Sequence, residues 1–321
     1  MGTKAIFIAS TDNYLPYLHV LLNSIEKRCE NPKDLDVYIL HHEFPVKYFD
    51  FTHLFSFNVI PISVDRSSIE CPIETKRIEF IKRARFSYII EYAMKYDSVC
   101  LLDADMFIVS PQFFDLFELV RGKRFMVGCN ERFKWQIGPN FTANGEPLFT
   151  EPTKLYNMHC SVPIIFDMPS WKYVFEYYNR ICFNGKQVDK EGNVKGIGDI
   201  FCWNIAVQKL ARACDMIIFP MEAMTQVHQT NLAPQTFMVV ENDYWFTNAG
   251  DRVYSIHGRV AQDGWAEGHM ERYYRDMGDN AAPGLTAKLE GKVRCGLEAI
   301  VDEWHRLESM TFPIGGMVQK K

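Results

Sequence analysis

The stretch VCLLDADMFIVS, residues 99–110, places two aspartates, Asp103 and Asp105, inside an apolar run. Burying an unpaired carboxylate is costly, because the charge loses its hydration. Where a strand ends and the chain turns, both side chains can reach one ligand. A solvated turn would explain an isolated Asp-x-Asp, but here the apolar residues 106–109 follow at once. We therefore interpret the pair as the end of a core strand, where a divalent cation compensates the charge.

Apolar runs and helical patterns alternate on the N-terminal side of this stretch. Strands are predicted at KAIFIAS (4–10), LDVYILHH (35–42), FNVIPISV (57–64) and SVCLLDAD (98–105), and helices over 15–28 and 74–95. In the second helix the pattern turns Ile78, Ile81, Phe86, Ile89, Ile90 and Ala93 inward and Lys76, Arg77, Lys82, Arg83 and Arg85 outward. This alternation indicates an α/β fold with a mostly parallel central sheet flanked by helices.

Polar residues follow the first predicted strand as well as the fourth. Thr11, Asp12 and Tyr14 come directly after KAIFIAS, and the two aspartates end SVCLLDAD. In parallel sheets, ligands bind at the carboxyl ends of the strands. We therefore expect both clusters at one edge of the sheet.

The second half of the chain is less regular. Strands are predicted at FMVGCN (125–130), CSVPIIFD (160–167) and RVYSIHG (252–258), and helices over 170–182, 199–211 and 286–309. Residues 130–157 and 183–198 are rich in Gly, Pro and Asn and are expected to form loops. No linker separates independent domains, so the sequence predicts a single domain.

The composition fits a globular protein with a large core, because 47% of the 321 residues are hydrophobic. A formal net charge of -5 argues against binding nucleic acid through charge alone. No apolar stretch reaches about 18 residues, so we expect no membrane span. The N-terminus is too short and too polar for a signal peptide. The nine cysteines form no Cys-x-x-Cys pair, which indicates free thiols, no zinc site and a cytoplasmic location.

Five segments, in the correct order, resemble motifs of the GT-A fold glycosyltransferases. Within them the chain is most similar to the glycogenin and lipopolysaccharide-galactosyltransferase group, glycosyltransferase family 8. The segments are IFIASTDNYLPYLHVLLNSI (6–25), LLDADMFIV (101–109), CSVPIIFDMPSW (160–171), GDIFCWN (198–204) and HGRVAQDGW (257–265). The resemblance implies a GT-A domain over 1–266, with a nucleotide-binding half (1–110) and an acceptor-side half (111–266). A C-terminal helical extension would follow over 267–321.

The resemblance also implies a metal site. It makes Asp105 and His257 ligands of Mn²⁺ or Mg²⁺, with Asp103 contributing to the metal and to the ribose of a UDP-sugar donor. Two carboxylates and an imidazole suit these ions. The alternative for His257 is a buried, hydrogen-bonded core histidine.

Donor contacts follow from the same resemblance. Thr11, Asp12 and Tyr14 would hold the nucleobase, Arg85 would face the donor, and Asp199 would lie near the reacting carbon of the sugar. Three of these residues have an alternative interpretation. Tyr14 would be the first core residue of its helix, Arg85 a residue of a solvated helix face, and Asp199 a helix N-cap.

The chain departs from the family pattern at several positions. Cys160 and Ser161 stand in the donor-binding segment where the family has Asn-Ala, and Ile200 replaces a glutamine. The family lysine that contacts the diphosphate falls at Asp263, and a carboxylate cannot stabilise a diphosphate directly. Arg259 is the candidate that replaces this lysine as a catalytic cation. The resemblance implies transfer with retention of anomeric configuration.

The function predicted is metal-dependent transfer of a sugar from a nucleotide sugar to an acceptor. A nucleotidyltransferase is the first alternative, although ASTDNY (9–14) lacks the glycines of a phosphate-binding loop. A non-catalytic sugar-nucleotide-binding protein with a decayed site is the second. The acceptor stays open among a glycan, a protein, a lipid and a modified nucleic-acid base, as does the oligomeric state.

Overall fold

The structure is a computed structural model of the chain. The residues that it describes are 3–42, 44, 49–65, 77–122, 126–129, 136–155, 163–212, 215–219, 238–241, 244–247, 252–257 and 296–310.

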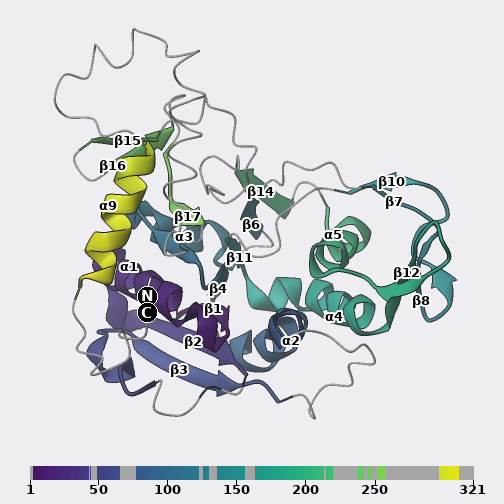
Figure 1. The fold of residues 1–321 in the computed structure, drawn as a ribbon, viewed down its shortest axis with the longest axis horizontal. Helices are drawn as coiled ribbons and strands as arrows, with labels where there is room; N and C mark the ends of the chain where they lie inside the picture. Colours follow the sequence, from purple (N-terminus) through teal and green to yellow (C-terminus); the bar gives the residue numbers. More distant parts are fainter. Residues whose placement is uncertain are drawn as a thin grey trace, which may run out of the picture.

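A seven-stranded sheet forms the centre of the molecule (Figure 1). Its strands, in spatial order, are β14 (Met216–Phe219), β6 (Met126–Cys129), β11 (Ile164–Phe166), β4 (Ser98–Asp103), β1 (Lys4–Ser10), β2 (Leu35–His41) and β3 (Asn58–Ser63). Strand β11 runs antiparallel to both of its neighbours, and the other pairings of this sheet are parallel. The predicted α/β architecture with a mostly parallel sheet is confirmed.

Helices cover both faces of this sheet, since alternate strand residues point to opposite sides. Ile6 and Ile8 of β1 belong to one hydrophobic cluster together with α1 (Leu15–Arg28) and α3 (Leu116–Val120). Phe7 belongs to the other, together with α2 (Arg77–Tyr92), α4 (Met168–Asn184) and α5 (Asp199–Leu210). The central strands are therefore buried on both faces, which explains their continuous apolar sequences.

Helix α1 follows the predicted pattern closely. A 3₁₀ turn over Asp12–Tyr14 leads into it, and a proline occupies its first turn, where the missing N–H costs nothing. The predicted inward residues are all buried: Leu18, Leu21, Leu22 and Ile25.

The outward face predicted for α2 is wrong at two positions. Arg83 and Arg85 are buried, with 6% and 0% of their surface exposed. Burial is possible because Arg83 donates a hydrogen bond to the carbonyl of Cys182 and Arg85 forms an ion pair with Asp103. The inward residues Ile81, Phe86, Ile89 and Ala93 are buried as predicted.

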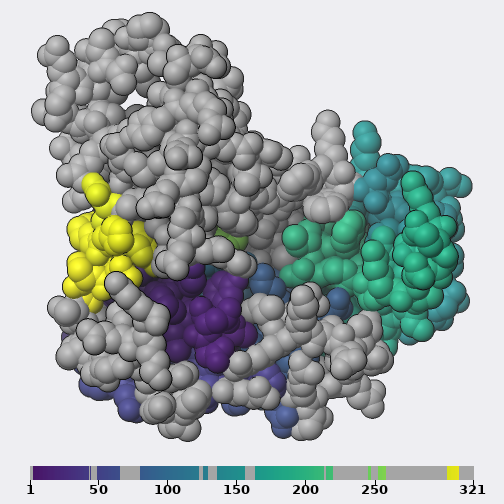
Figure 2. All heavy atoms as spheres, in the orientation of Figure 1, coloured from purple at the N-terminus to yellow at the C-terminus, as the bar shows by residue number. Residues whose placement is uncertain are grey.

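The segments predicted as loops carry short antiparallel strands. One small sheet has the order β13 (Val194–Gly196), β12 (Gly185–Val188), β8 (Phe141–Ala143) and β9 (Glu146–Pro147), and β7 (Gln136–Ile137) pairs with β10 (Thr153–Lys154). At the tip of the β12–β13 hairpin, the Asp189 carboxylate accepts hydrogen bonds from the backbone N–H groups of Glu191 and Asn193. With α4 and α5 these strands form the teal and green lobe of Figure 2.

The C-terminal part of the chain packs back on the first half. Strand β17 (Ser255–His257) pairs antiparallel with β5 (Met106–Ile108), and β15 (Met238–Glu241) pairs with β16 (Tyr244–Thr247). Helix α9 (Gly296–Glu308) lies beside α1 in Figures 1 and 2, where the Asn23 side chain donates to the carbonyl of Leu307 at 2.7 Å.

Among the described helices, none combines the length and the apolar character that crossing a membrane requires. The predicted C-terminal helix is confirmed over 296–308, and residues 286–295 lie outside the described part. The predicted boundary near residue 266 also lies outside it, so the division into two domain halves and an extension stays a prediction.

Candidate metal and donor site

Asp103 and Asp105 lie at the turn between β4 and β5. Asp103 is the last residue of β4, and Asp105 directly precedes β5. Only 5% and 7% of their surfaces are exposed. Two carboxylates this deeply buried require positive partners, and three side chains from β17 and α2 supply them.

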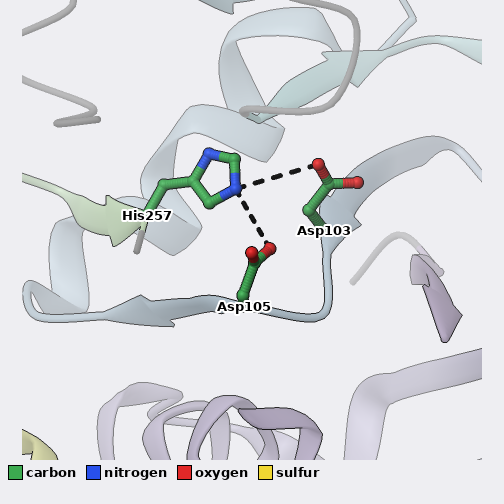
Figure 3. Close-up of side chains that lie close together, drawn as sticks. All are labelled: Asp103, Asp105 and His257. Atoms are coloured by element: carbon green, nitrogen blue, oxygen red, sulfur yellow. Dashed lines mark hydrogen bonds and ion pairs between the residues drawn. The ribbon is translucent and has the colours of Figure 1, made fainter. Parts of the chain in front are cut away.

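The first partner comes from the far end of the chain. The pairing of β17 with β5 sets His257 opposite Met106, so the imidazole lies beside the turn. His257 Nε2 is 3.0 Å from Asp105 Oδ1 and 3.8 Å from Asp103 Oδ2, as Figure 3 shows. One ligand atom from each of the three residues lies within 4.8 Å of the others.

This geometry shifts the pKa of each of the three groups. Burial raises the pKa of Asp103 and Asp105, but the surrounding cations outweigh burial and hold both values below the ordinary range. Burial lowers the pKa of His257, and the two carboxylates outweigh it, so that the value is raised. His257 is buried and hydrogen-bonded, as the alternative reading expected, and its partners are the two aspartates of the turn.

The second partner is Arg85 of α2. Its Nη1 lies 3.6 Å from Asp103 Oδ1, and its Nη2 lies 3.6 Å from Asp199 Oδ2. The interpretation of Arg85 as part of a solvated helix face is therefore wrong. The guanidinium is fully buried between two carboxylates and joins the end of β4 to the start of α5.

The third partner is Lys82, one helical turn before Arg85. Its Nζ lies 3.6 Å from Asp103 Oδ2, and 33% of its side chain is exposed. The helix pattern predicted a solvated position for Lys82 and gave no sign of this contact. The available signal was the i, i+3 spacing of Lys82 and Arg85, which puts the two cations on the same side of the helix.

Asp199 is the first residue of α5, and Gly198 occupies the N-cap position. The reading of Asp199 as the N-cap is therefore wrong. Its carboxylate is 26% exposed and faces Arg85.

Arg83, which also belongs to α2, donates to the carbonyls of Cys182 at 2.8 Å and of Ile197 at 2.9 Å. It thereby connects α2 to the end of α4 and to the loop before α5.

The predicted nucleobase loop lies at the same sheet edge. Ala9 pairs with Asp103, so the residues after β1 emerge next to the aspartate turn. Thr11 is buried, Asp12 is exposed, and Tyr14 is partly buried with its ring 5.6 Å from that of Tyr17. Tyr14 also packs at the margin of the core on the α1 side. The prediction that the two polar clusters share one edge is confirmed.

Four residues singled out in the sequence lie outside the described part of the chain. They are Cys160, Ser161, Arg259 and Asp263.

The comparisons with known proteins agree with this geometry. The family model of glycosyl transferase family 8 matches residues 5–163, which include the loop after β1 and the aspartate turn. No curated protein sequence matches the chain.

Two solved structures of LgtC share the fold. One is a complex of the galactosyltransferase with donor and acceptor sugar analogs, at 17% identity and a TM-score of 0.51. The other is an active-site mutant, at 16% identity and a TM-score of 0.52. Each similarity covers 86% of this chain and 95% of LgtC.

The bifunctional glycosyltransferase WbbM is more distant, at 14% identity and a TM-score of 0.49. That similarity covers 69% of this chain, which spans 39% of the length of WbbM. The family model assigns residues 5–163 to glycosyl transferase family 8, and the mixed sheet and the LgtC neighbours show the GT-A fold: this part of the chain is a glycosyltransferase domain of the family 8 type.

Proposed function

We propose that the protein transfers a sugar from a UDP-sugar to an acceptor in a reaction that depends on Mn²⁺ or Mg²⁺. One observation carries the proposal: Asp103, Asp105 and His257 present ligand atoms within 4.8 Å of one another at the carboxyl edge of the sheet. LgtC, which has the same fold, is known with donor and acceptor sugar analogs, and this supports a sugar donor here.

The residues present fit such an ion. Two carboxylate oxygens and one imidazole nitrogen form a donor set that Mn²⁺ accepts well and Mg²⁺ tolerates, with diphosphate oxygens completing the shell. When bound, the metal supplies Lewis-acid stabilisation of the charge that develops on the leaving nucleoside diphosphate. Asp103 and Asp105 would be ligands of this ion, and His257 would become one after it loses its proton.

The remaining residues act on the donor. Thr11, Asp12 and Tyr14 hold the nucleobase beyond β1, Arg85 orients Asp103 and Asp199, and the partly exposed Asp199 faces the donor sugar near the reacting carbon. Arg259, Cys160 and Ser161 complete the donor site in this proposal, and transfer proceeds with retention. Cys29, Cys100, Cys182 and Cys202 are free thiols, which supports a cytoplasmic location.

The test is ligand-dependent stabilisation. Mn²⁺ together with UDP should raise the Tm of the wild-type protein, because a ligand that binds only the folded state stabilises it. Asp105→Ala should abolish the shift, whereas Asp34→Asn, an exposed aspartate away from the site, should keep it. Absence of any shift with UDP and either metal would refute the donor assignment. Hydrolysis of a panel of nucleotide sugars would then identify the donor sugar.

A further inference from the structure

We propose that Lys82 is a donor-binding residue: its ammonium neutralises Asp103 in the metal-free protein and binds the donor diphosphate once the metal is in place. This inference rests on the proposed function. It assigns a role to a residue that neither the family resemblance nor the metal-ligand geometry includes.

Lys82 lies directly beside the carboxylate of Asp103. Lys82 and Arg85 project from the same side of α2, and each approaches a different oxygen of one carboxylate. Lys82 Nζ lies 3.6 Å from Asp103 Oδ2, and Arg85 Nη1 lies 3.6 Å from Oδ1. The end of β4 therefore lies between two cations from one helical turn.

The two cations differ in their freedom to move. Arg85 is fully buried and is held by Asp199 as well as by Asp103. One third of the Lys82 side chain is exposed, and its flexible stem allows the ammonium to swing without disturbing the core. Lys82 is thus the cation that can change partner when the charge in the site changes.

A metal would force that change. The oxygen that Lys82 approaches, Asp103 Oδ2, also lies 3.8 Å from His257 Nε2. A divalent ion held by Asp103 and His257 would stand next to the ammonium, and like charges at such a distance in a buried site repel each other strongly. In the proposed function the donor diphosphate would bind the same metal as Asp103, so it would be the anion that the displaced ammonium meets.

The charge balance of the site supports this role. A divalent ion offsets Asp103 and Asp105, and Arg85 is offset by Asp199. Lys82 is then a partly exposed cation next to Asp103, which places its ammonium where it can bind the doubly negative diphosphate. The family lysine that contacts the diphosphate falls at Asp263 in this chain, so a cation from α2 would take over that contact.

Calorimetric titration tests the proposal with two probes, Mn²⁺ alone and UDP at saturating Mn²⁺. In Lys82→Gln the Kd of Mn²⁺ should fall, because its competitor for Asp103 is gone. The Kd of UDP should rise about tenfold, as expected for loss of a charge-assisted hydrogen bond. Lys82→Arg should recover most of the UDP affinity. Lys33→Gln, an exposed lysine away from the site, is the matched control and should change neither value.

Opposite shifts of the two affinities would support the proposal. An unchanged UDP affinity in Lys82→Gln would overturn it, and so would a parallel weakening of both ligands, which indicates a purely structural role. Failure of the wild-type protein to bind UDP with Mn²⁺ or Mg²⁺ would instead refute the proposed function itself.

Discussion

Asp103 shows how one buried charge is tolerated in this fold. Its carboxylate receives Lys82 and Arg85 from α2 and lies near His257 from β17. Each contact alone is longer than a strong hydrogen bond, and together they lower the pKa of a group that burial alone would raise. The residue is therefore ionised and available to a metal at neutral pH.

Metal affinity should depend on the protonation of His257. The pKa of His257 is raised by the two aspartates, and a metal must displace that proton to bind the ring. The Kd of Mn²⁺ should therefore fall as the pH rises from about 6 to about 8, across and above the ordinary histidine pKa. Calorimetry at several pH values measures this. In His257→Gln the affinity should be weaker and its pH dependence flatter, and an unchanged pH profile would argue against His257 as a ligand.

Arg83 should matter for stability. Arg83→Met leaves the carbonyls of Cys182 and Ile197 without their donor, so the free energy of unfolding should fall by about 1–3 kcal/mol. Urea unfolding measures the change. Arg83→Lys retains one donor group and should lose less, while equal losses in both variants would mean that shape rather than hydrogen bonding matters at this position.

The elements were predictable to different degrees, for physical reasons. β1, β2 and β4 are buried on both faces, so their apolar runs were visible in the sequence. The strands of the small lobe are two to four residues long, too short to show a period of two. The buried arginines of α2 were missed because a helix pattern reports the type of residue and not the carboxylates or carbonyls that face it.

Helix α9 should contribute strongly to stability through Trp304. This residue is 1% exposed and contacts the rings of Phe107 in β5 and Tyr17 in α1. Trp304→Ala should lower the free energy of unfolding by about 3–5 kcal/mol, because it opens a cavity between these elements. His305→Ala, at an exposed position of the same helix, should change it by less than about 0.5 kcal/mol. Equal unfolding midpoints for the two variants would show that α9 is only loosely packed.

At the scale of the whole molecule, the site depends on segments that are distant in sequence. The sheet edge, the loop after β1 and the aspartate turn come from the first 110 residues, and their places in the fold were predicted from the strand and helix patterns. His257 was found through resemblance, because nothing local to VYSIHG indicates which strand it would join. The pairing of β17 with β5 is a tertiary contact, and it brings His257 beside the aspartate turn.

Global stability should decline in mild acid. The pKa of His19 and that of His41 are lowered to about 4 by burial, and both rings contact phenylalanines. Between the unfolded value of 6.5 and about 4, the unfolded chain binds protons that the folded protein does not. The free energy of unfolding should therefore fall as the pH drops through this window.

Urea unfolding at several pH values tests this expectation. The raised pKa of His257 acts in the opposite sense and in a separate window, above 6.5. The double variant His19→Gln, His41→Gln should have a flatter profile below pH 6.5 than the wild-type protein. A slope that survives in the double variant would assign the acid sensitivity to other groups.

The pairing of β5 with β17 also has a consequence for protein synthesis. His257 and Asp105 are separated by 152 positions. Both aspartates therefore leave the ribosome long before their imidazole partner does. Until β17 emerges, Lys82 and Arg85 of α2 are the described cations beside the carboxylate pair, and the nascent chain cannot yet offer His257 as a ligand. In the proposed function, binding of a metal by all three residues would therefore have to wait until β17 has paired with β5.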